Sequence, residues 1–200
     1  MLMRRLAIAF VLLGTSLARA EPALTISCED RLFAKDSSHQ RLVAAFGKQN
    51  VALESERAGP NIDFQSVIFP KDPKRKLIVV WDDGESRSVP RTLIIEKPSQ
   101  WAAPKGIRLG MPLAELERAS GAPVTITGFS FFMGGGVESD GLRNLPGGCG
   151  ISITMEPTAK LPRPQMDKIS TRDSFPSTDP LIHKAQPVIN RLSVSFAPGR

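Results

Sequence analysis

The stretch from Gly106 to Phe129, GIRLGMPLAELERASGAPVTITGF, predicts a short helix between two glycine-marked breaks, followed by a strand. Pro112 suits the first turn of a helix, where a missing N–H has no helical partner to lose. The apolar positions recur at the spacing of a single helix face: Leu113, Leu116 and Ala119. Gly121 is the natural left-handed terminator, and Pro123 prevents the helix from continuing. This pattern is typical of a helix that packs on a sheet.

An active site is the alternative interpretation of this stretch, and its residues do not favour it. No residue in it is a nucleophile with a base beside it. Its two carboxylates, Glu115 and Glu117, stand two apart on the predicted helix, so they face different directions and cannot form a paired acid–base site by themselves. Together with Arg118 they are expected to point away from the core.

A second short helix is predicted over residues 39–46, HQRLVAAF, with Ser37 or Ser38 as its N-cap and Gly47 as its stop. Strand patterns dominate the remainder, at Asn61–Phe69, Lys76–Trp81, Ser86–Glu96, Val124–Phe132, Gly150–Met155 and Ile189–Phe196. The prolines from Pro157 to Pro187 predict a long irregular connection. Together these elements predict an α+β fold, an antiparallel sheet with two short helices.

The chain also contains a candidate internal repeat. A shift of 74 residues aligns the two predicted helices and places Gly47 on Gly121. The same shift places LIVVWD, residues 77–82, on ISITME, residues 151–156. Because the identities are few, a duplicated helix-plus-sheet unit and a chance similarity both stay open. If the unit is duplicated, residues 21–104 form the first copy, and residues 105–200 form the second, which includes the proline-rich connection and the closing strand.

The first twenty residues predict a secretory signal peptide. Arg4 and Arg5 precede the apolar run LAIAFVLL, and Ala18-Arg19-Ala20 fits the A-x-A cleavage pattern. The run is too short to span a bilayer, which takes about 20 residues, and no later apolar stretch is long enough. We therefore expect residues 1–20 to be removed, leaving a periplasmic or secreted protein with no integral membrane span.

The charge balance does not favour a nucleic-acid-binding protein. The chain has 26 basic and 20 acidic residues, but three of the basic residues lie in the leader. The mature chain therefore keeps an ordinary excess of about three positive charges. The one dense basic run, KDPKRK at residues 71–76, is interpreted as a solvated hairpin loop around Pro73.

The two cysteines, Cys28 and Cys149, predict a disulfide, because a single pair in an oxidising compartment is most often bonded. The bridge would close a loop of about 120 residues, worth about 4–5 kcal/mol in the chain-entropy model. Gly147 and Gly148 are expected to let the backbone approach the bridge partner closely. A reactive thiol would need a nearby histidine or resolving cysteine, which the sequence lacks. Lipid attachment at Cys28 is not favoured either, because Thr25 stands where such a site carries leucine.

Residues typical of catalytic, metal and cofactor sites form no recognisable motif. The two histidines, His39 and His183, have no H-x-x-H or H-E-x-x-H partner, and each is expected to be solvent-exposed or capping. No G-x-S-x-G elbow supports a serine hydrolase. The glycines at 134–136 lack the Gly-Lys-Ser/Thr of a phosphate loop, and a hairpin or bulge between strands is favoured there. We therefore assign no catalytic, cofactor-binding or metal-binding residue.

The segment GIRLGMPLAELERASGAP resembles the GM-x-x-x-E-(V/L)-x-x-x-x-G-x-P motif of small bacterial envelope proteins, those of the small outer-membrane lipoprotein A type and the β-lactamase-inhibitor-protein-like modules. The resemblance is looser over Trp101 to Met155, which includes GFSFFMGGGVESDG. It implies a helix packed on a curved antiparallel sheet, often in tandem, in proteins that act as assembly factors or protein-binding modules. Because the motif is structural, no catalytic role carries over to the matched residues.

A group of uncharacterised periplasmic proteins is similar as well. Its members usually carry a Trp-Asp-Tyr-like triplet before the glycines, and this chain has Phe131, Phe132 and Met133 there instead. In this chain, one of Phe131 and Phe132 must leave the core face if the strand stays regular, because side chains alternate across a strand. An exposed aromatic beside glycines is typical of a protein-contact patch, and cover by the proline-rich segment is the alternative.

We therefore take Phe131, Phe132 and Met133 as the candidate partner contact. The function we expect is a non-catalytic exported binding or envelope-assembly module that contacts a protein or another cell-envelope component. The alternative is a secreted hydrolase whose site carries no recognisable motif.

Overall fold

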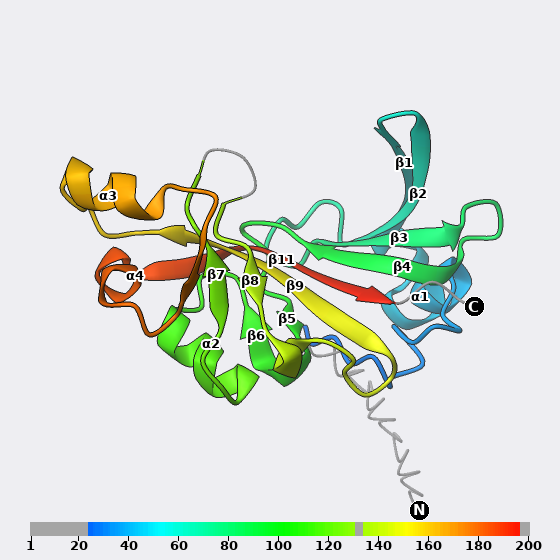
Figure 1. Ribbon diagram of the computed structural model, residues 1–200. Coiled ribbons are helices and arrows are strands. Elements are labelled where there is room, and N and C mark those ends of the chain that lie inside the picture. Colours follow the sequence, from blue (N-terminus) through cyan, green and yellow to red (C-terminus); the bar gives the residue numbers. More distant parts are fainter. Residues whose placement is uncertain (1–23, 131–133, 197–200) are drawn as a thin grey trace, which may run out of the picture.

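The computed structural model describes residues 24–130 and 134–196 of the chain. Within them, a six-stranded antiparallel sheet forms the centre, in the order β1-β2-β3-β4-β11-β9 (Figure 1). Its strands are β1 (Val51–Ala58), β2 (Asn61–Ile68), β3 (Leu77–Asp83), β4 (Ser88–Ile95), β9 (Cys149–Pro157) and β11 (Pro187–Phe196). The predicted α+β class is confirmed.

Shorter elements continue this architecture beyond β9. The strand β7 (Thr125–Thr127) lies between β8 (Val137–Glu138) and β10 (Ser174–Pro176), and a bridge from Gly136 to Thr154 ties β8 to β9. A separate ladder joins β5 (Ala102–Ala103) to β6 (Ile107–Arg108). The 3-10 helices are η1 (Lys48–Asn50), η2 (Pro104–Gly106) and η3 (Asp140–Leu142).

Both predicted helices form. The helix α1 (His39–Phe46) begins after Ser38, whose hydroxyl accepts a backbone N–H of the first turn, and it ends at Gly47. The helix α2 (Leu113–Ser120) ends at Gly121, which is left-handed, as predicted. Its apolar face packs on the core through Leu113, Leu116 and Ala119. In the described part of the chain, no helix is long and apolar enough to cross a membrane.

Two details of α2 differ from the expectation. Pro112 precedes the helix as its N-cap instead of lying in its first turn. Glu117 does not simply point into solvent, because its carboxylate accepts a hydrogen bond from the hydroxyl of Ser177 at 2.5 Å. That hydroxyl in turn accepts the backbone N–H of Val124 at 3.0 Å. The contact ties α2 to the segment after β10.

The proline-rich connection is the main error of the sequence prediction. It contains β10 and two further helices, α3 (Arg163–Ile169) and α4 (Pro180–Ala185), so the described residues form four α-helices instead of two. Pro164 and Pro180 lie in the first turns of these helices, and the side chain of Asp179 caps α4. Proline is favoured at that position because its absent N–H has no helical partner there.

Two strands also differ from the prediction. β1 was not expected, because half of its sequence VALESERA is polar, with the four charged or hydroxyl side chains in succession at residues 54–57, and it forms the edge of the sheet, where polar side chains face solvent. Of the strand expected over Val124–Phe132, the described residues 124–130 form only the three residues of β7. At Gly128 a Cβ would lie 2.6 Å from the carbonyl oxygen of Thr171. The chain therefore turns against the backbone after α3, and the N–H of Phe129 donates to the carbonyl of Ile169.

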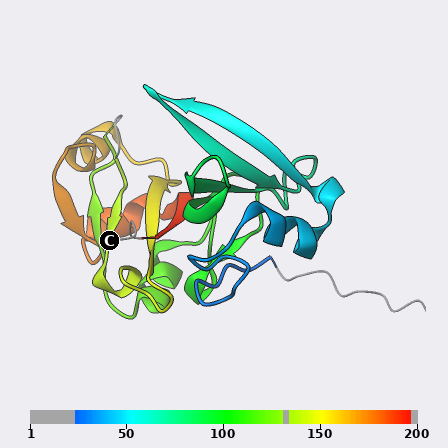
Figure 2. The same ribbon diagram turned by 90° about the vertical axis from the view of Figure 1, so that its right-hand side faces the viewer.

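The main core lies on one face of the sheet, beneath α1, α2 and α4. Trp101 is fully buried in it and meets Phe33 and Phe46 edge to face, at ring distances of 5.6 and 6.1 Å. Burial of each large apolar side chain contributes roughly 1.5–3 kcal/mol. The β1–β2 hairpin extends beyond this core and projects from the body of the molecule (Figures 1 and 2).

The predicted disulfide between Cys28 and Cys149 is present, and it ties the segment before α1 to the start of β9. Gly147 is required beside it. Its φ is +82°, and a Cβ there would lie 2.4 Å from the carbonyl oxygen of Cys28. The glycine therefore lets the backbone approach the bridge partner, as expected.

The two halves of the chain share part of their order of elements. A shift of 74 residues places α1 on α2 and places β3 within β9. In the first half a helix precedes the four strands β1 to β4; in the second, α2 precedes β7, β8, β9 and β11, with α3, β10 and α4 inserted between β9 and β11. The strand order is mirrored across the sheet, with β4 and β11 paired at the junction. The division between residues 104 and 105 stays a prediction.

Candidate functional site

The face of the sheet opposite the main core has two parts. A small apolar cluster of Val67, Ile78, Val80 and Ile94 covers β2 to β4, and the part over β4, β11 and β9 carries small side chains, most of them hydroxyls. Along β9, the buried residues Ile151, Ile153 and Met155 alternate with outward-facing ones. The strands β11 and β4 alternate in the same way. We call the resulting surface the sheet trough; its residues are Thr92, Ile94, Ser152, Thr154, Ser193 and Ser195.

Two adjoining cavities lie over the sheet trough. The first, of about 580 Å³, lies over β4, β11 and β9. The second, of about 710 Å³, lies between β9, β8 and the segment from Arg143 to Gly148. Both are lined by Ser152 and Ile153, so they meet on β9. Each cavity falls in the range of ligand-binding clefts, about 300–1,000 Å³.

Several hydroxyls of the sheet trough are free to bind a ligand. Thr92 and Ser195 bond to each other across strands, with 3.2 Å between their oxygens. Ser152 and Ser193 have no side-chain partner within the described residues. A hydroxyl can both donate and accept, so the surface suits uncharged hydrogen-bonding groups.

Charged side chains stand at the ends of the two cavities. At one end, Lys97 and Asn190 both donate to the carboxylate of Glu156. The hydrogen bond from Lys97, with a smaller one from Asn190, holds the pKa of Glu156 below its usual value. Asn190 lies at a β-bulge of β11, and its buried Oδ1 has no partner within the structure as described. At the other end, the exposed Arg143 lines the larger cavity.

The side chains that line the two cavities include hydroxyls, a cysteine and the carboxylates of Glu96 and Glu138. Within residues 24–130 and 134–196, no hydroxyl lining the two cavities bonds to a histidine or a carboxylate. Cys149, which lines the larger cavity, is held in the disulfide. In the same ranges, no group of three or more His, Cys, Asp or Glu residues is placed to hold a metal ion. The hydroxyls can donate and accept hydrogen bonds, and none of them is bonded to a histidine or carboxylate within the described residues.

A serine–histidine contact lies on the opposite face, in the core. Nδ1 of His39 is 2.8 Å from the hydroxyl of Ser66, and the indole N–H of Trp81 donates to the same hydroxyl at 2.9 Å. Ser66 is 0 % exposed, so a substrate cannot reach it. Burial and the neighbouring charge of Arg87 lower the pKa of His39. The expectation that His39 is exposed or capping is therefore wrong, because the ring is half-buried and joins α1 to β2.

The predicted contact residues Phe131, Phe132 and Met133 lie outside the described residues. The glycines after them can be placed. A Cβ on Gly135 would lie 2.0 Å from the carbonyl oxygen of Met155, so this backbone lies directly on β9. Gly136 lines the larger cavity. Gly136 therefore lies at the margin of the sheet trough.

Sequence reasoning missed the residues of the sheet trough themselves. A signal was present, because the stretches GISITM of β9 and LSVSF of β11 carry a hydroxyl or glycine at each of their outward positions. The neighbours that complete the surface could not be read from the sequence. Thr92 and Ser195 bond to each other although they lie 103 residues apart.

Comparison with known proteins adds little to this geometry. No family model matches the chain, and no curated protein matches it. Among solved structures, the uncharacterized protein YfeY from Escherichia coli is similar, with 14% identity over 82% of this chain and 90% of that chain, at a TM-score of 0.40. A likeness this distant carries no functional argument.

Proposed function

We propose that the chain is an exported, non-catalytic binding module that holds an envelope protein, or another cell-envelope component, over its sheet trough. The observation that carries this proposal is the pair of adjoining cavities that meet at Ser152. Their unpaired hydroxyls can bind a ligand, and within the described residues none of them is hydrogen-bonded to a histidine or carboxylate that would activate it.

Three further points support the proposal. The leader pattern of residues 1–20 predicts export. The Cys28–Cys149 disulfide is of a kind that persists in oxidising compartments. The resemblance of residues 106–123 to envelope modules implies assembly or protein binding, and it is independent of the cavities.

The sheet trough favours a partner with an extended, uncharged hydrogen-bonding segment. Outward-facing residues of a strand repeat at about 7 Å, and the hydroxyls of Ser152 and Thr154 follow this interval on β9. A polypeptide segment in extended conformation offers polar groups at the same interval. Arg143, at the far end of the larger cavity, can donate hydrogen bonds to a carboxylate or carbonyl group of the partner.

Site-specific cross-linking tests the proposal. A photoreactive amino acid is placed at Ser152 or at Ser193, and the matched control carries it at the exposed Ala114 of α2. We expect one common partner to cross-link from both trough positions in a periplasmic extract, and not from Ala114. With that partner purified, Ser152→Arg should weaken binding at least about tenfold by filling the cavity, with no change in melting temperature. Equal cross-linking from Ala114, or full affinity of Ser152→Arg, would refute the assignment.

A further inference from the structure

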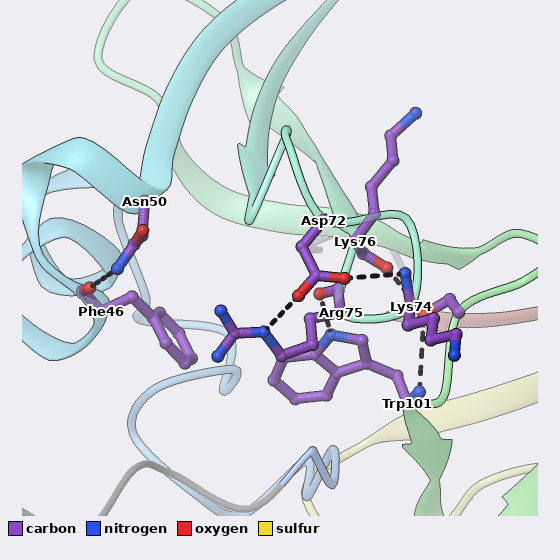
Figure 3. Close-up of polar contacts among 8 residues, drawn as sticks. Phe46, Asn50, Asp72, Lys74, Arg75, Lys76 and Trp101 are labelled. Atoms are coloured by element: carbon purple, nitrogen blue, oxygen red, sulfur yellow. Dashed lines mark hydrogen bonds and ion pairs between the residues drawn. The ribbon is translucent and has the colours of Figure 1, made fainter.

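The basic loop at residues 71–76 lies between β2 and β3. Its backbone carbonyls accept hydrogen bonds from residues 99–101, and these bonds fix its conformation. Three successive carbonyls accept hydrogen bonds from three consecutive residues, each at 2.7 Å: Lys74 from the N–H of Gln100, Arg75 from the indole of Trp101, and Lys76 from the hydroxyl of Ser99. Figure 3 shows the contact between Trp101 and Arg75. Trp101 and Ser99 are both buried. Because its carbonyls point to the interior, the loop differs from the solvated turn that its sequence predicts.

Asp72, the single acidic residue of the loop, forms hydrogen bonds within the loop. The carboxylate of Asp72 accepts the backbone N–H of Lys74 at 3.1 Å and Nε of Arg75 at 2.8 Å (Figure 3). The hydrogen bond from Arg75 is the main reason why the pKa of Asp72 lies below its usual value. The guanidinium of Arg75 stacks 4.0 Å from the ring centre of Phe69. The contact between Asp72 and Arg75 therefore fixes both side chains and stabilises the loop.

The remaining cations of the loop face outward. Lys71 and Lys74 are exposed, and their ammonium groups form no ion pair within the described residues. Lys76 pairs with Glu96 at 3.5 Å. The exposed Lys48 belongs to η1, which adjoins the loop because the carbonyl of Asn50 accepts the N–H of Phe69 at 2.7 Å. The loop with its fixed backbone therefore presents two exposed lysines without an ion pair among the described residues, Lys71 and Lys74, and we call it the basic ridge.

We propose that this ridge docks the protein on an anionic phospholipid surface, with Lys71 and Lys74 contacting headgroup phosphates. An ammonium group recognises phosphate as a point charge. Because the backbone is already fixed, docking costs little ordering entropy. Each such lysine strengthens attraction to an anionic surface about fivefold, and the effect fades within a Debye length of about 8 Å at physiological salt. The contact is therefore peripheral, reversible and sensitive to salt.

This site is separate from the sheet trough, since no residue of the loop lines either cavity. A lipid surface is the phosphate-bearing partner that an exported chain meets, so this choice of partner depends on the export part of the proposed function. Vesicle binding by the purified protein does not involve the trough partner. The two proposals can therefore fail independently.

Co-sedimentation with vesicles is the test. The mature protein is mixed with vesicles of equal parts phosphatidylglycerol and phosphatidylcholine, or with phosphatidylcholine alone, at rising salt. We expect binding to the anionic vesicles only, and a loss of about 25-fold or more in Lys71→Glu/Lys74→Glu. The matched control is Lys160→Glu/Lys168→Glu, which changes net charge equally at exposed positions elsewhere and should bind nearly as the parent does. Free glycerol phosphate should not displace the protein from the vesicles, because single soluble phosphate groups do not form an extended anionic surface.

A further variant separates loop geometry from net charge. Asp72→Asn raises the positive charge but removes the brace on Arg75, so it should bind the anionic vesicles less tightly. The proposal is overturned by binding to neither vesicle, by equal binding to both, by equal losses in the two lysine pairs, or by displacement with free glycerol phosphate. Tighter binding of Asp72→Asn would overturn the role of the fixed loop.

Discussion

Ser66 of β2 and His39 of α1 are joined by a 2.8 Å hydrogen bond on the core side of the sheet. Trp81 of β3 donates to the same hydroxyl, so a single oxygen links a helix to two strands. Arg87, in the turn between β3 and β4, is the charged neighbour that disfavours a proton on the histidine.

The shifted pKa of His39 predicts that stability falls in mild acid. The folded-state pKa lies below the ordinary value of 6.5, so the unfolded chain binds a proton first as the pH decreases. The free energy of unfolding should therefore decline below about pH 6.5 until the folded-state pKa is reached. Urea unfolding at pH 7 and pH 5 measures this difference. His39→Gln should reduce it, while His183→Gln, at an exposed position, should not. An identical decline in His39→Gln would show that other groups cause it.

Substitution at Gly147 should destabilise the fold by about 3 kcal/mol, from a left-handed backbone penalty plus a steric clash. The added methyl of Gly147→Ala would meet the backbone of Cys28 at 2.4 Å, which cannot move without disturbing the disulfide. Gly59→Ala is the control, since Gly59 is also left-handed, with φ of +63°, but has open space around its Cβ position. Chemical denaturation should show a loss of only about 1–2 kcal/mol in the control. Equal losses in both variants would rule out the clash.

The disulfide makes two measurable predictions. The unfolded, unreduced protein should contain no free thiol, as a labelling reagent would report. Cys28→Ala/Cys149→Ala should lower the free energy of unfolding by about 4–5 kcal/mol, because the bridge closes a long loop. Labelling of the unreduced protein at either cysteine would contradict the pairing.

Ser177 should contribute more to the stability of the fold than its small side chain suggests. It is 0 % exposed and satisfies both the N–H of Val124 and the carboxylate of Glu117. Ser177→Ala leaves the buried N–H of Val124 without its acceptor, which costs about 1–3 kcal/mol. The exposed Ser174→Ala should change stability by less than about 0.5 kcal/mol. Thermal unfolding of the two variants gives the comparison, and similar melting temperatures would disprove a structural role for Ser177.

The local parts of this fold could be predicted, because their determinants lie within a few residues of each other. The first helix has its cap at Ser38 and its stop at Gly47, and the second has its stop at Gly121. The helices α3 and α4 could not be predicted in the same way. Proline in a first helical turn and proline in a loop look alike in sequence, as Pro164 and Pro180 show.

The candidate site was harder to predict than the fold, because it is assembled from distant segments. The hydroxyls on β9 and β11 alternate in the sequence, but only the pairing of β11 with both β9 and β4 makes them one surface. The basic run at 71–76 was recognised, yet its rigidity depends on Ser99 to Trp101, which no local pattern connects to it. Composition alone cannot distinguish a braced loop from a solvated one.

The bridge from Cys28 to Cys149 joins the segments before and after η2 by a second covalent route, besides the peptide chain itself. Lys105 is exposed in η2, where a trypsin-like protease can reach it. A chain nicked there would still migrate as one species in non-reducing electrophoresis and would separate into two fragments after reduction. The molecule can thus survive a cut at its midpoint without losing either half.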